Sequence, residues 1–143
     1  MSADGKAEGV EPMEWAEITI VFWVSHLVGD FLLQTEWQAT SKYAGLGRDR
    51  TARVALFSHV SVYTLCFVPA LVWIGEGTSA LAAVGLGAVI FFPHLVIDDG
   101  RLLHTYMLRV KRAPDPQSVA LLVVVDQSLH LIFLWATAML AVA

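Results

Sequence analysis

The chain has 143 residues, of which 57% are hydrophobic and 15% charged, and its mean hydropathy is +0.63. A soluble domain has about a quarter of its residues charged, so these values exclude an ordinary water-soluble domain and indicate a surface that faces lipid. The net charge is −4, and the single cysteine, Cys66, excludes an intrachain disulfide and a thiolate metal cluster.

The first 16 residues are polar and acidic, with four carboxylates against Lys6 alone. They lack the basic region of a secretory signal. We predict that residues 1–16 form an exposed, disordered tail and that residues 17–143 form one transmembrane domain.

Four apolar runs follow this tail. A helix needs about 20 residues to cross a bilayer; the second and fourth runs reach that length, the third is close, and the first needs its polar ends. The connection after the second run is short, so the second and third helices must form a tight antiparallel hairpin. The fold class that we predict is all-α, a four-helix transmembrane bundle with spans at about residues 17–34, 54–74, 79–97 and 119–142.

The basic residues predict the orientation of this bundle. Basic loops of membrane proteins stay in the cytoplasm. We therefore place loops 35–53 and 98–118 in the cytoplasm and both termini outside. Eight of the nine basic residues lie in these loops: Lys42, Arg48, Arg50, Arg53, Arg101, Arg109, Lys111 and Arg112.

The second basic loop has apolar residues at helical spacing before Pro114 and Pro116 end any helix. Two interpretations stay open for it. One is a short interfacial helix between the third and fourth spans, lying on the inner leaflet and attracted to anionic lipid. The other is a solvated basic loop that only sets the orientation.

Ionisable residues recur inside the predicted spans, although each costs roughly 2.5–3.5 kcal/mol near the bilayer centre. Three pairs have i,i+4 spacing, which places both side chains on one face of a helix. Counted along the helices, all of them fall in the cytoplasmic half or near the middle of the bilayer. The candidate metal ligands are His26, Asp30, His59, His94, Asp98, Asp126 and His130, with Gln34 and Gln127 as further polar residues.

These residues indicate a metal site, because the spans hold three aspartates and no lysine or arginine to neutralise them. Imidazole and carboxylate ligands without sulfur suit zinc, iron or manganese, and seven ligands could hold one or two divalent ions. Two alternatives remain: each residue could be a hydrogen-bonded packing device, or the set could form a metal-free network or proton path.

The segments His26–Gln34, His94–Asp98 and Asp126–His130, together with His59, resemble a family of small bacterial membrane proteins catalogued as domain of unknown function 3307. The resemblance implies a four-helix membrane fold with shared polar positions, located in the bacterial cytoplasmic membrane. It implies no activity. More loosely, the chain is similar to membrane-bound metal-dependent hydrolases.

Our leading hypothesis is a membrane-embedded metal-dependent hydrolase that acts on an ester or phosphoester of a lipid-like substrate at the inner leaflet. Asp98 or Asp99 would serve as general base, and the basic loops would favour an anionic lipid or lipid-linked substrate. The alternatives are an ion or proton transporter, a non-catalytic scaffold with a polar or metal layer, and a non-haem iron oxidase or hydroxylase. We expect no nucleic-acid partner, and the sequence leaves homo-oligomerisation open.

Overall fold

The computed structural model describes residues 14–113 and 119–143. Within them the chain forms seven α-helices and one π-helical segment without any strand, which confirms the all-α class. Most of the predicted tail, together with Pro114 and Pro116, lies outside the described residues. The elements are α1 (Trp15–Leu27), η1 (Val28–Leu32), α2 (Glu36–Ser41), α3 (Arg50–Cys66), α4 (Val68–Gly77), α5 (Ala80–Asp98), α6 (Arg101–Arg109) and α7 (Val119–Ala141).

Three helical stretches in the described residues are long and apolar enough to cross a membrane: Trp15–Leu32, Ala80–Asp98 and Val119–Ala141. A fourth exists if α3 and α4, which meet at a bend of 46°, count as one broken span. The break follows from Pro69, since proline has no N–H for the helical bond to the residue four positions before it. The second predicted run is therefore helical over its length but divided at Phe67.

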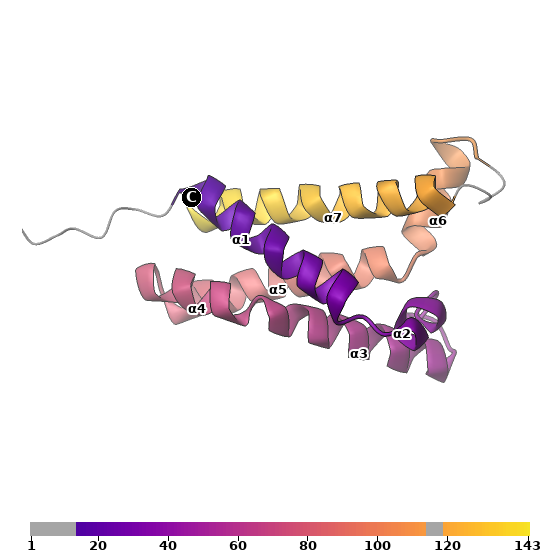
Figure 1. Cartoon of the computed structure of the whole chain (residues 1–143), viewed down its shortest axis with the longest axis horizontal. Helices are drawn as coiled ribbons and strands as arrows, with labels where there is room; N and C mark the ends of the chain where they lie inside the picture. Colours follow the sequence, from indigo (N-terminus) through magenta and orange to yellow (C-terminus); the bar gives the residue numbers. More distant parts are fainter. Residues whose placement is uncertain (1–13, 114–118) are drawn as a thin grey trace, which may run out of the picture.

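The helices α1, α3, α4, α5 and α7 run roughly lengthwise through the molecule (Figure 1). The start of α1, the end of α7 and the turn between α4 and α5 lie at one end, while α2 and α6 lie at the other. The described parts of the two basic loops therefore lie at one end of the molecule, and the start of α1 and the end of α7 at the other.

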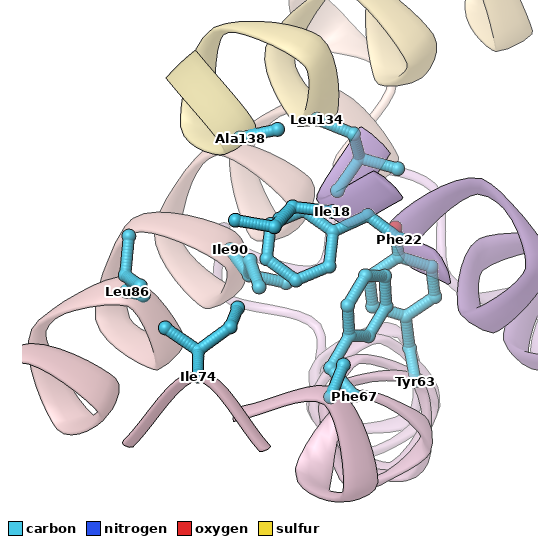
Figure 2. Close-up of a cluster of buried hydrophobic side chains, with 10 residues drawn as sticks. Ile18, Phe22, Tyr63, Phe67, Ile74, Leu86, Ile90, Leu134 and Ala138 are labelled. Carbon is cyan, nitrogen blue, oxygen red and sulfur yellow. The ribbon is translucent and has the colours of Figure 1, made fainter. Parts of the chain in front are cut away.

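An apolar core fills the half of the molecule that holds the start of α1 and the end of α7. Figure 2 shows side chains from α1, α3, α4, α5 and α7 meeting there. The rings of Phe22 and Phe67 make an edge contact with centroids 5.6 Å apart, and Tyr63 follows with its centroid 5.0 Å from that of Phe67. Tyr63 marks the boundary, because polar residues begin on its other side.

The second basic loop does contain a helix, α6. Its buried residues Leu103 and Met107 pack against Val125 of α7 rather than facing outward. Leu102 and Val110 remain half exposed or more. Of the two interpretations left open, the helix is therefore the one present, but part of the apolar face that would have contacted lipid packs within the protein.

Candidate metal centre

Four buried side chains converge between η1, α3 and α5. They are Asp30, His59, His94 and Asp98, and their side chains are between 1% and 6% exposed. One ligand atom from each lies within 4.8 Å of all the others. The group could therefore hold a metal ion.

The distances within this group match the size of a small coordination shell. The Nε2 atom of His59 lies 2.7 Å from Oδ2 of Asp98 and 3.3 Å from Oδ1 of Asp30. The Nε2 atom of His94 lies 3.2 Å and 3.6 Å from the same two oxygens. The two Nε2 atoms are 3.1 Å apart. Ligands of a tetrahedral zinc ion are about 3.3 Å from one another, since each lies about 2.0–2.1 Å from the metal.

Hydrogen bonds within the protein do not satisfy every buried polar atom of this group. Oδ1 of Asp30 is buried and has no hydrogen-bond partner in the described part of the chain. A hydrogen bond between the facing Nε2 atoms of His59 and His94 needs one donor and one acceptor, so it uses one proton. A buried acceptor without a donor is costly, and a cation at the centre would satisfy it. The residues present thus fit a divalent ion.

Asp30 lies on an irregular turn that brings it toward α3. It belongs to η1, a π-helical turn, and such turns are frequent at functional sites. The preceding Gly29 packs directly on Tyr63: a Cβ atom at this glycine would lie 2.7 Å from Cδ2 of Tyr63. The missing side chain of Gly29 allows η1 and α3 to approach this closely.

Tyr63 supports the group from the apolar side. Its ring stacks on the ring of His94, with centroids 3.4 Å apart and planes 6° apart. The Nδ1 atoms of His59 and His94 have no hydrogen-bond partner in the described residues, so packing of this kind holds the rings in place. Our sequence reasoning missed Tyr63. Its spacing of four residues from His59, which puts both on one helix face, was the available signal.

His26, which the sequence suggested as a ligand, is not one of the four converging residues, although its Nδ1 lies 3.5 Å from Oδ2 of Asp30. Its Nε2 donates to Oε1 of Gln127 at 2.8 Å, so Nδ1 accepts from the hydroxyl of Tyr63 at 3.1 Å. The side-chain nitrogen of Gln127 donates to Asp126 at 3.2 Å and reaches Asp30 at 3.5 Å. His26 and Gln127 therefore form a hydrogen-bonded link between α1 and α7 beside the cluster.

A second group lies on the other side of Asp98. Asp98, Asp126 and His130 also offer ligand atoms within 4.8 Å of one another. Nε2 of His130 is 3.5 Å from Oδ1 of Asp98, and the Asp126 side chain is 22% exposed. Six of the seven predicted ligands thus fall into two groups that share one aspartate.

Lys42 reaches a buried aspartate although it lies outside every predicted span. It lies in the loop after α2, and its Nζ donates to Oδ2 of Asp98 at 2.8 Å. The sequence places this lysine outside every span and 56 positions from its partner. Only the path of the loop brings it to the cluster.

Asp99 and Gln34 are not brought into either group. Oδ1 of Asp99 accepts from the backbone N–H of Leu46 at 2.7 Å, and its carboxylate also binds Arg101. The backbone oxygen of Asp99 accepts from Ala44 at 2.8 Å. Asp99 therefore fastens the loop that carries Lys42. The side-chain nitrogen of Gln34 is buried and has no hydrogen-bond partner among the described residues.

A family model described as "Protein of unknown function (DUF3307)" matches residues 18–143, which is nearly the whole chain. The resemblance carried by the histidine and aspartate segments is confirmed by this match. No curated protein and no solved structure matches the chain significantly.

Proposed function

The chain belongs to this DUF3307 family of proteins of unknown function, and we propose from the geometry of its site that it is a membrane-embedded, metal-dependent hydrolase. In this proposal Asp30, His59, His94 and Asp98 bind a divalent ion, with zinc, manganese or iron as the candidates. The substrate is an ester or phosphoester of a lipid-like molecule at the inner leaflet.

One observation gives the strongest support for the metal site. Five of the distances among the four ligand atoms fall between 2.7 and 3.6 Å, around the value of about 3.3 Å for a tetrahedral shell. A cation at the centre would also satisfy Oδ1 of Asp30, which is buried without a hydrogen-bond partner in the described residues.

Charge supports the same assignment. Asp30, Asp98 and Asp126 lie close together, and Lys42 is the basic residue that reaches them in the described part of the chain. With neutral histidines, one lysine leaves the cluster negative, which is expensive in a membrane interior. A divalent ion offsets that charge.

A bound ion with a position open to water or substrate would polarise the scissile ester and lower the pKa of a water molecule. The protein's own residues hold the ligands in place for this. The link from His26 to Gln127 orients Asp30, and Tyr63 fixes the ring of His94. The loop fastened by Asp99 covers the centre on the side of Lys42.

The membrane arrangement belongs to the proposal. We place four spans in the bilayer, with α3 and α4 as one broken span, α6 at the inner leaflet and both termini outside. Large exposed apolar side chains on α1, α5 and α7, such as Ile20, Leu81 and Ile132, support contact with lipid. The basic loops support the cytoplasmic assignment, and a bacterial cytoplasmic membrane follows from the resemblance.

Cysteine labelling tests the orientation. In a Cys66→Ser background, Glu76→Cys and Arg48→Cys place single thiols at the two ends of the molecule, both at exposed positions. A membrane-impermeant maleimide added to intact cells should label only the first. Labelling of Arg48→Cys alone would reverse the proposed orientation.

Metal content tests the site. Detergent-purified wild-type protein should retain a divalent ion, measured by mass spectrometry, and His94→Ala should lose it. His104→Ala is the matched control, since His104 is exposed on α6 outside the cluster. Equal metal content in all three proteins, or none in the wild type, would contradict the site. Hydrolysis of nitrophenyl esters and phosphoesters in mixed micelles then tests the activity.

A structural metal layer is the second candidate function. Its support is that four protein ligands close a tetrahedral shell, which is typical of structural zinc sites. Bound metal without hydrolysis of either probe class, and a lower unfolding temperature after chelation, would favour this candidate over the hydrolase.

A further inference from the structure

We infer that a second divalent cation binds beside the first, held by Asp98, Asp126 and His130, with the carboxylate of Asp98 bridging the two ions. This inference rests on the proposed function, because the first ion occupies the site described there. It deepens that function by identifying where the substrate would meet the metal.

The two oxygens of Asp98 face different partners. Oδ2 faces His59 at 2.7 Å and His94 at 3.2 Å, whereas Oδ1 faces His130 at 3.5 Å. An aspartate that divides its oxygens between two sets of ligands has the arrangement of a bridging ligand. In two-metal sites the ions lie about 3.5–4 Å apart, a separation that one bridging carboxylate spans.

His130 provides the independent sign of a missing cation. Its Nδ1 donates to the backbone oxygen of Asp126 at 3.0 Å. In the neutral ring Nε2 then carries a lone pair rather than a proton. This Nε2 is buried and has no hydrogen-bond partner in the described residues, and it faces the carboxylate of Asp98. Two acceptors that face each other repel. A cation between them is attracted by both.

The second position is more open than the first. It has three protein ligands instead of four, and one of them, Asp126, is 22% exposed where Asp98 and His130 are each 2% exposed. Catalytic zinc sites typically have three protein ligands and leave the next position to water or substrate.

We therefore assign the closed four-ligand position to an ion that orients Asp98 and the open position to the ion that meets the ester or phosphoester. Two divalent ions exceed the charge of the three aspartates by one. The loss of one proton from bound water, together with withdrawal of Lys42 from Asp98, would balance this excess. Lys42 has a route outward, because its side chain is 18% exposed.

Metal stoichiometry tests the second site. Ion-free protein in detergent is titrated with Zn²⁺, and bound ions per chain are counted after gel filtration. We expect two in the wild type, two in His104→Ala and one in His130→Ala. One ion in all three proteins would overturn the second site and leave the proposed function standing. A wild-type protein that binds no ion would contradict both the second site and the proposed function.

A measurement on the unmutated protein covers the case in which His130→Ala does not fold. The wild type is loaded with Mn²⁺ and examined by electron paramagnetic resonance. Two ions bridged by Asp98 should give a spin-coupled spectrum at full loading. A six-line spectrum of isolated Mn²⁺ at full loading would overturn the bridged pair, even where the total metal content is high.

Discussion

Nζ of Lys42 lies 2.8 Å from Oδ2 of Asp98, the same oxygen that faces His59 and His94. The lysine thus occupies one side of an atom that would bind the proposed ion. An ammonium group and a divalent ion a few ångströms apart repel each other strongly in a partly buried site. Lys42 and the ion should therefore compete for Asp98.

Replacement of Lys42 by methionine, which keeps the length of the side chain, should raise the affinity for Zn²⁺ by about tenfold, or about 1.4 kcal/mol. The same change should destabilise the ion-free protein by on the order of 3 kcal/mol, because it leaves a buried carboxylate without its cation. Competition titration with a zinc-binding dye measures the first effect, and unfolding in mixed micelles measures the second.

Lys111→Met is the matched control for this prediction. Lys111 is exposed just after α6, so its loss should change neither quantity. If Lys42→Met bound zinc as the wild type does, the lysine would not compete with the ion for Asp98.

Tyr63 has two separable roles. Tyr63→Phe keeps the ring stacked on His94 but removes the hydroxyl that donates to His26, and should cost about 1–3 kcal/mol of stability. Its zinc affinity should stay near that of the wild type. Tyr63→Leu also removes the stacked ring, and should weaken zinc binding as well. Equal zinc affinity in both variants would show that the stacked ring does not position His94.

The close approach of η1 to α3 depends on Gly29. A Cβ at this position would lie 2.7 Å from the side chain of Tyr63 and 3.2 Å from its Cα, so Gly29→Ala must displace Asp30 or Tyr63. We expect a loss of about 1–3 kcal/mol and weaker metal binding. Gly85→Ala is the control, since a Cβ there meets nothing within 4 Å. A thermal unfolding temperature for Gly29→Ala at or above that of Gly85→Ala would contradict this packing.

We expect Asp99 to stabilise the loop that carries Lys42 rather than to take part in hydrolysis. Asp99→Ala removes the acceptor for the backbone of Leu46 and the partner of Arg101, so trypsin should cleave faster after Lys42 or Arg48. The number of bound ions should not change. Asp99→Asn, which keeps one carbonyl acceptor, should be cleaved more slowly than Asp99→Ala. Lost hydrolysis with unchanged cleavage would instead return Asp99 to the catalytic role that the sequence suggested.

The sequence by itself determined the helical class, the apolar runs and the set of residues from which the site is built. These features are local: hydrophobic runs specify helices that can face lipid, and i,i+4 spacing places two side chains on one helix face. His94 and Asp98 illustrate this, because both were predicted from spacing and both lie in the four-residue group.

Only the tertiary structure decided how those residues are divided. His26 and Asp30 share a helical face by spacing, yet His26 bonds to Gln127 while Asp30 joins the ligands. The sequence placed Lys42 in a loop outside every span, and the loop fastened by Asp99 brings it to Asp98. Spacing fixes a side chain's face on its own helix. The packing of the helices and the path of the loops fix which other residues that face meets.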